Sequence, residues 1–127
     1  GATALHCAVR AGSSELVDML IKVGADLSVA DSWGSLPLHL AKFCHDDTDL
    51  IKLCLQPGID IDVREKGLGQ TALAFAAKMN YVRGVEFLLE RGSDLEATDD
   101  YGDIALFVSV LGRAPKSIEI LLSRGAE

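Results

Sequence analysis

Hydrophobic residues recur along this chain in groups with helical spacing, and each group returns after 33 to 35 residues. One group contains a leucine at a fixed place in each copy: Leu5, Leu38, Leu73 and Leu106. In the other group, an apolar residue is followed three and four positions later by a pair of apolar residues. The first residue of this group is Val17, Ile51, Val85 or Ile118 in the four copies. Apolar residues at i, i+3 and i+4 indicate one buried stripe on a helix. The pattern predicts two short helices per copy, over about 5–11 and 16–23 in the first.

Two series of glycines share this period. Gly24, Gly58, Gly92 and Gly125 are separated by 34, 34 and 33 residues, and Gly1, Gly34, Gly69 and Gly102 by 33, 35 and 33. Glycines of the first series are placed to end the second helix of each copy in a left-handed conformation. Glycines of the second series lie at the end of the polar link that leads to the next copy. We expect one domain over 1–127, with repeats at approximately 1–30, 31–64, 65–98 and 99–127. Single-residue insertions in 46–49 and 65–68 fall in predicted loops.

The repeated residues resemble those of the ankyrin repeat family. Residues 34–41 read G-S-L-P-L-H-L-A, which is similar to the family motif G-x-T-P-L-H-x-A. Residues 1–8 are a second copy, 69–76 lack the proline and histidine, and 102–109 match least. The resemblance implies an all-α solenoid of stacked helix-turn-helix units with β-hairpin fingers, about four repeats, truncated at both ends. It also implies a structural hydrogen bond for His6 and His39, and protein binding along finger tips and concave inner helices.

Composition and charge restrict the classes of partner. Hydrophobic residues make up 49% of the chain and the formal net charge is -7, so a folded domain is expected and nucleic acid or an anionic membrane is disfavoured. A protein partner with a basic patch is favoured instead. Three cysteines without a C-x-x-C spacing indicate a reducing, intracellular setting, either cytoplasmic or nuclear. The most apolar stretch, 104–111, is too short to span a membrane.

Three segments resemble sites of other chemistry. Residues 67–72 match G-x-G-x-x-A, but no strand pattern of a dinucleotide-binding unit surrounds them, so we expect no cofactor. The adjacent Cys44, His45 and Asp46 are poorly placed to converge on one metal ion. Asp46, Asp47 and Asp49 are better explained as acidic residues that favour a helix N-terminus than as calcium ligands. We predict no catalytic activity.

Residues that the repeat does not need are candidates for partner binding. Trp33 and Tyr101 precede glycines at predicted finger tips, where they either contact a partner or pack on the neighbouring finger. The ends of the first helices offer a second surface, unless they pack between units. The candidates on both surfaces are Arg10, Asp31, Ser32, Trp33, Phe43, Lys66, Lys78, Met79, Asp99, Asp100, Tyr101 and Leu111.

The sequence thus predicts a protein–protein interaction module that acts as a monomer or as part of a longer chain. The alternative is a regulatory or targeting ankyrin segment of a larger enzyme, channel or toxin. The fourth unit is rich in apolar residues between Ile104 and Leu111, whereas the last unit of a solenoid requires a polar outer face. We therefore expect either that more protein follows or that something else covers this face.

Overall fold

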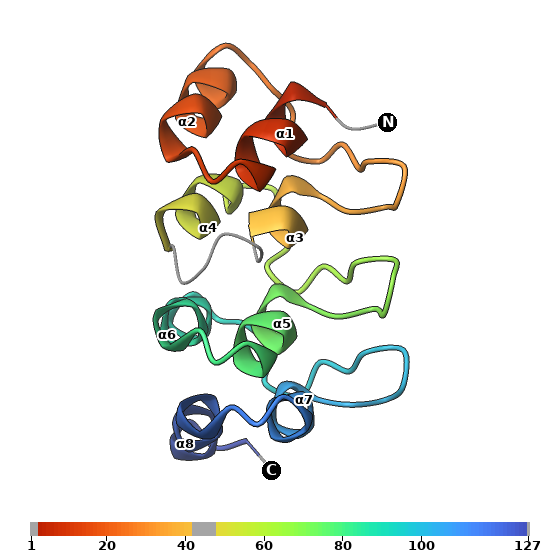
Figure 1. Cartoon of the computed structure of the whole chain (residues 1–127), viewed down its shortest axis with the longest axis vertical. Helices are drawn as coiled ribbons and strands as arrows, with labels where there is room; N and C mark the ends of the chain where they lie inside the picture. Colours follow the sequence, from red (N-terminus) through yellow and green to blue (C-terminus); the bar gives the residue numbers. More distant parts are fainter. Residues whose placement is uncertain (1–2, 42–47, 127) are drawn as a thin grey trace.

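The computed structural model describes residues 3–41 and 48–126. Helices pair in four successive layers, and long loops project to one side of the stack as fingers (Figure 1). The described helices are α1 (Ala4–Arg10), α2 (Ser14–Lys22), α3 (Pro37–Ala41), α4 (Thr48–Cys54), α5 (Ala72–Lys78), α6 (Val82–Glu90), α7 (Ala105–Leu111) and α8 (Pro115–Ser123). The all-α solenoid predicted from the repeat is confirmed, with α1, α3, α5 and α7 on the finger side and α2, α4, α6 and α8 on the other.

Each layer contributes large apolar side chains to a continuous core. Three of the four leucines that define the first helical group, Leu5, Leu38 and Leu73, are fully buried, and Leu106 is half-buried. Val17 and Val85 of the second group are buried as well. Burial of one such side chain stabilises the fold by about 1.5–3 kcal/mol. A helix pair alone has one apolar side without cover, so the stability of each layer depends on its neighbours.

Polar residues just ahead of the helices determine where several of them begin. The Thr3 hydroxyl accepts the backbone N–H of His6, and the Ser13 hydroxyl accepts that of Leu16. Thr71 does the same for Ala74 at the start of α5. Because Ser13 satisfies a free N–H of the first turn, α2 begins at Ser14, ahead of the position 16 that the apolar pattern indicated. Pro37 begins α3, where its missing N–H has no consequence.

Glycines directly follow the C-caps of α2, α6 and α8, as the sequence predicted, but α4 ends at Cys54, before Gly58, because Pro57 has no N–H with which to continue the helix. Gly24 has a φ of 94° and Gly58 a φ of 98°, values at which a Cβ atom would be strained. At Gly24 the N–H bonds to the carbonyl oxygen of Ile21, which closes the last turn of α2.

The fingers are hairpin turns that are closed by few backbone bonds. Asp31 N–H donates to the Ser35 carbonyl at 2.9 Å, and Asp99 N–H donates to the Asp103 carbonyl at 3.0 Å. Within the described ranges 3–41 and 48–126 no residue is assigned to a strand. The fingers therefore have the turns of the β-hairpins implied by the resemblance, without extended strand pairing.

None of the helices in the described part of the chain is both long and apolar enough to traverse a lipid bilayer.

Candidate protein-interaction surface

A buried carboxylate fixes the turn of the first and third fingers. The Asp31 carboxylate accepts the N–H groups of Trp33 and Ser35, each at 2.9 Å. Asp99 accepts the N–H groups of Tyr101 and Asp103 at the same distance. Both aspartates are buried, although the sequence made them candidates for direct contact with a partner. Their carboxylates are therefore used inside the turn, where they hold the following aromatic residue outward.

The charge of Asp31 is balanced by its surroundings. Burial raises the pKa of its carboxyl group, but the N–H donors of Ser35 and Trp33 and the nearby His6 and Arg10 outweigh that effect, so the pKa lies below its ordinary value. The Arg10 guanidinium is 3.9 Å from the carboxylate. The ionised form of Asp31 is thus the form that stabilises the first finger.

The second finger is one residue longer, and a longer side chain compensates for the added length. Glu65 takes the place of Asp31 and Asp99, and its carboxylate accepts the N–H groups of Leu68 at 2.6 Å and Gln70 at 3.3 Å. The extra methylene of glutamate spans the extra residue of the loop. All three fingers therefore keep a carboxylate at the centre of the turn.

The tip of each finger presents a hydrophobic residue to solvent. Trp33 is 78% exposed and Tyr101 is 76% exposed, so neither packs on the neighbouring finger. Leu68 occupies the same place in the second finger and is also exposed. Sequence reasoning left Leu68 out of the candidate set, although its position directly before Gly69 matches that of Trp33 before Gly34. We call Trp33, Leu68 and Tyr101 the fingertip row.

Contacts between neighbouring fingers hold this row together. Asp100 N–H donates to the Leu68 carbonyl oxygen at 2.9 Å, and the Asp100 carboxylate pairs with the Arg64 guanidinium at 2.5 Å. The Lys66 side chain lies against Gly34, so closely that a Cβ atom there would overlap it. The fingers thus form one surface, in which the charge of Asp100 is about half exposed and partly compensated.

The motif histidines attach the inner helices to the fingers. His6 Nε2 lies 3.0 Å from the Ser35 carbonyl oxygen, and His39 Nε2 lies 3.0 Å from that of Val63. His39 Nδ1 accepts the Leu36 N–H at 3.0 Å, so Nε2 carries the proton and donates. The structural hydrogen bonds implied by the family resemblance are confirmed.

The ends of the inner helices form a second exposed region. Met79 follows the last residue of α5 and is exposed, and so is Leu111, the last residue of α7. Arg10 and Lys78 are the equivalents of Leu111 in the first and third units, where Arg10 is exposed and Lys78 is half-buried. The apolar strip expected from the sequence also includes Phe43, which lies outside the described residues. Ser32 and Lys66 are exposed in the first and second fingers.

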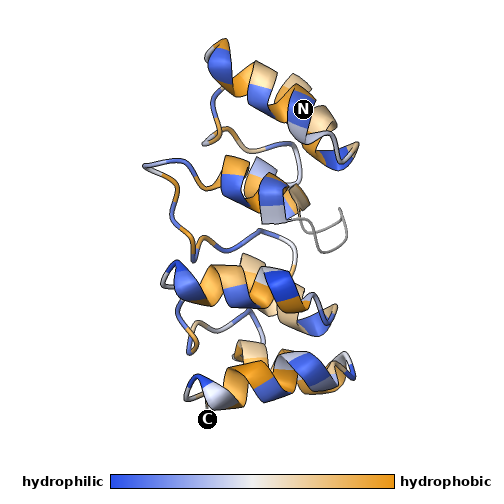
Figure 2. Ribbon diagram, turned by 90° about the vertical axis from the view of Figure 1, so that its left-hand side faces the viewer, coloured by the Kyte–Doolittle hydropathy of each residue, from blue (hydrophilic) through white to orange (hydrophobic). Residues whose placement is uncertain are grey.

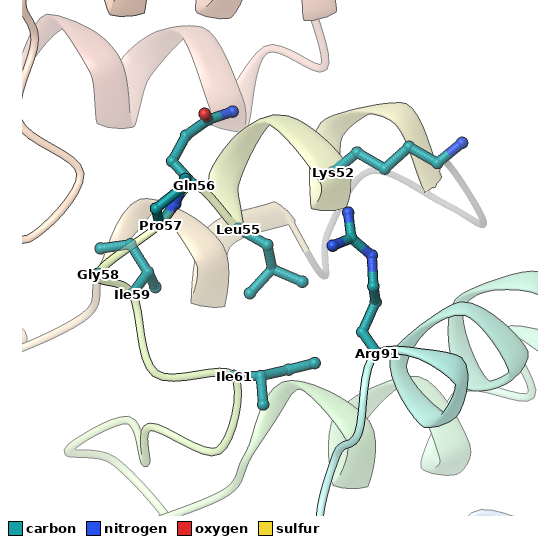
Figure 3. A pocket seen from close by; sticks show the side chains of 8 residues that line it. All are labelled: Lys52, Leu55, Gln56, Pro57, Gly58, Ile59, Ile61 and Arg91. Carbon is teal, nitrogen blue, oxygen red and sulfur yellow. The ribbon is translucent and has the colours of Figure 1, made fainter.

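A hollow of about 430 Å³ lies on another part of the molecule, between α4 and the end of α6 (Figure 3). Arg91 rises from the end of α6 toward α4, while Leu55 and Ile61 point into the space between them. Arg91 lies 5.1 Å and Lys52 5.5 Å from the centre of the Phe87 ring. The Lys52 contact joins α4 to α6, whereas the Arg91 contact lies within the end of α6, and both give the cation a structural role.

The segments that resemble other chemical sites have structural roles where they are described. Residues 67–72 form the end of the second finger and the start of α5, with Thr71 as the helix cap, and a loop precedes them. Asp49 lies in the first turn of α4, as the capping interpretation predicted. Cys44, His45, Asp46 and Asp47 lie outside the described residues. Residues 3–41 and 48–126 contain no group of three or more potential metal ligands.

The stacked helix pairs, left-handed glycine caps and histidine-anchored fingers define a repeat solenoid of the kind that binds other proteins. The family model for ankyrin repeats in three copies matches residues 1–65 and 38–127. The chain belongs to the ankyrin repeat family, whose repeats are general protein–protein interaction modules.

The chain matches short sections of much longer proteins. Human neurogenic locus notch homolog protein 1 is 31% identical over 126 residues, which cover 99% of this chain and 5% of that protein. Human SH3 and multiple ankyrin repeat domains protein 2 is 29% identical over 125 residues, which cover 98% of this chain and 7% of that protein. The chain thus spans well under a tenth of the length of these curated relatives.

Proposed function

We propose that this chain binds a protein or peptide partner across the fingertip row and the exposed ends of its inner helices. The observation that carries the proposal is the exposure of Trp33 and Tyr101 at equivalent finger tips. Large aromatic side chains are costly to leave in water and are frequent among interface residues with the largest binding energies. Their backbones are fixed by Asp31 and Asp99, so little conformational entropy is lost on binding.

The other candidate residues have distinct roles in this proposal. Met79 and Leu111 supply apolar contact at the ends of the inner helices, and methionine adapts to different partner shapes. Phe43 is a further apolar candidate from the sequence, outside the described residues. Asp31 and Asp99 position the aromatic residues from within the turns. The remaining candidates form the polar rim: Arg10, Ser32, Lys66, Lys78 and Asp100.

A partner with a basic patch fits this surface best. The chain has a net charge of -7, which attracts cationic partners over a distance of about 10 Å at 0.1 M salt. At short range Asp100 is the exposed carboxylate that remains at the finger edge, since Asp31 and Asp99 are buried. Added salt should therefore slow association more than it speeds dissociation.

A double substitution tests this assignment. Trp33→Ala with Tyr101→Ala should weaken the binding of specific partners by at least about 30-fold, which is the loss of about 2 kcal/mol expected from a single hot-spot residue. The measurement is quantitative mass spectrometry of proteins captured by the immobilised chain. Val23→Ala is the matched control, because Val23 is exposed and apolar but lies after an outer helix. Equal recovery by the double variant and the wild type, with equal thermal midpoints, would refute the surface.

A regulatory or targeting role within a larger enzyme, channel or toxin is the second candidate. The small share of each relative that the chain covers favours this possibility. In that case the same surface would bind another region of the same protein, and the full-length sequence would reveal it. We assign no catalytic activity and no cofactor to the repeats themselves. Cys7 and Cys54 are free thiols, which supports an intracellular location in the cytoplasm or nucleus.

A further inference from the structure

The outer helix of the second unit is shorter than its equivalents. All four outer helices begin at the same place in the repeat, and α2, α6 and α8 each extend over nine residues. By contrast α4 extends over seven, because Pro57 disfavours helical backbone at the residue before it. Figure 2, in which the outer helices face the viewer, shows the shorter helix in the second layer. The Gln56 side-chain amide donates to the Leu53 carbonyl oxygen at 3.2 Å, in place of the N–H that Pro57 lacks.

The hollow of about 430 Å³ between α4 and the end of α6 lies at this shortened end (Figure 3). We call it the α4–α6 hollow. Leu55 and Ile61 point into it, and Ile59 lines it beside them. The other units have a small residue at the place of Ile59, which is Ala25, Ser93 or Ala126. The second unit therefore adds a branched apolar side chain to the lining, and a hollow of this size has room for a side chain of a ligand.

Two cations border the α4–α6 hollow. Lys52 occupies a place in the repeat that is acidic in the other three units. The residues at that place are Asp18, Glu86 and Glu119. Arg91 comes from the end of α6 in the next unit and rises toward α4 (Figure 3). A chain with a net charge of -7 thus places two positive charges at one hollow, one of them by reversing the charge of the repeat.

Carboxylates of the described residues compensate these two charges only in part. Among residues 3–41 and 48–126, no carboxylate forms an ion pair with Arg91. Lys52 lies 4.0 Å from the Asp49 carboxylate, and its side chain is 52% exposed, so this pair contributes little. The Phe87 ring holds both cations in place by the cation–π contacts described above. Because both cations also line the hollow, an anion bound there is attracted by both.

We propose that the α4–α6 hollow binds an acidic peptide segment of a partner protein. A carboxylate of the segment pairs with Arg91 and Lys52, and a neighbouring apolar side chain packs on Leu55 and Ile61. The apolar lining beside the cations favours a carboxylate on an apolar peptide over a free inorganic anion. The hollow lies on the outer helices, away from the fingers (Figure 1). This site is therefore separate from the fingertip row and selects the opposite charge.

Three defined probes test the site. The first is a short peptide with blocked ends and a leucine flanked by two glutamates, the second replaces both glutamates by lysines, and the third is inorganic phosphate. Each is titrated into the ¹⁵N-labelled chain while the NMR signals of residues 52–61 and of the Arg91 side chain are followed. The acidic peptide should give saturable shifts, with half-saturation about tenfold below that of phosphate because its leucine is partly buried. The lysine peptide should give none.

Charge substitutions at the hollow should weaken binding while the fold is kept. Lys52→Glu introduces the residue that the third and fourth units already have at this place, and it should weaken acidic-peptide binding by at least about tenfold. Arg91→Gln should give a similar loss, whereas Lys52→Arg keeps the charge and should bind as the wild type does. Lys116→Glu is the matched control, because Lys116 is exposed on α8 and the change in net charge is the same.

Pro57→Ala tests the shape of the hollow. It lets α4 continue as its equivalents do, so the helical signal in circular dichroism should rise while acidic-peptide binding falls. Absence of saturable shifts with the acidic peptide up to about 5 mM would overturn the proposal, as would equal half-saturation by phosphate. So would wild-type affinity of folded Lys52→Glu and Arg91→Gln, or an equal loss in Lys116→Glu. Trp33→Ala with Tyr101→Ala should bind the acidic peptide normally, which separates this site from the fingertip row.

Discussion

The side-chain oxygen of Asn80 accepts the backbone N–H of Ser117 at 3.1 Å, so a turn of the third unit caps the outer helix of the fourth. Ala114, which directly precedes α8, has no side chain to make this bond. Asn80 also has a φ of 59°, in the left-handed region that asparagine tolerates better than most residues. One residue thus combines a turn conformation with a helix cap 37 positions away.

Substitution of Asn80 separates these two contributions. Asn80→Gly keeps the left-handed turn and removes the cap, which should lower the free energy of unfolding by about 1 kcal/mol. Asn80→Ala removes the cap and adds backbone strain, so it should cost about 1 kcal/mol more. Urea denaturation followed by circular dichroism measures both. Equal destabilisation by the two variants would show that the turn conformation is not strained for alanine.

The ionisation of Asp31 should make the first finger sensitive to acid. Because its pKa in the folded chain is below the ordinary 3.8, the ionised group stabilises the fold above that value, and this contribution is lost as the pH falls through the folded pKa. Asp31→Asn retains an acceptor oxygen but never carries the charge. The stability difference between wild type and this variant should be greatest above about pH 5 and shrink below 3.8. Denaturation of both proteins from about pH 5 to below 3.8 measures it, and a difference independent of pH would contradict the interpretation.

The length of Glu65 should matter because the second finger is one residue longer than the others. In Glu65→Asp the carboxylate cannot reach the same N–H groups, and the variant should lose about 1–2 kcal/mol of stability. Deletion of Gly67 in the same variant would restore the loop length of the first and third fingers and should recover part of the loss. Thermal denaturation compares the two variants. Further destabilisation on deletion would argue against the match between loop and side chain.

Ser93 has a buried hydroxyl that makes no hydrogen bond, and it is the one such side chain among residues 3–41 and 48–126. The equivalent residues Ala25 and Ala126 have no hydroxyl to bury. Ser93→Ala should therefore raise the free energy of unfolding by about 1 kcal/mol, because an unpaired buried hydroxyl is removed. Chemical denaturation gives the difference directly. A loss of stability would indicate that the hydroxyl has a partner such as bound water.

The repeat period, the helix pairs and the left-handed glycines could be predicted from the sequence, because each depends on interactions between residues close along the chain. Leu5, Val17 and Gly24 have their roles within one helix pair, and residues one repeat period apart occupy equivalent places in the other pairs. The position of Trp33 and Tyr101 at finger tips was also predictable, since each directly precedes a glycine of the repeat, but only the structure decided that they are exposed. Leu68 was overlooked although the same register would have identified it.

Only the tertiary structure decided how the layers and fingers use their polar residues. Asp31 and Asp99 were candidates for direct contact with a partner, but the carboxylate of each accepts N–H groups of its own turn. The pairing of Arg64 with Asp100 and the capping of α8 by Asn80 join residues more than thirty positions apart. Sequence periodicity fixes which side of a helix is apolar. The burial of a particular polar or terminal residue depends on what packs against it, and that follows from the stacking of the layers.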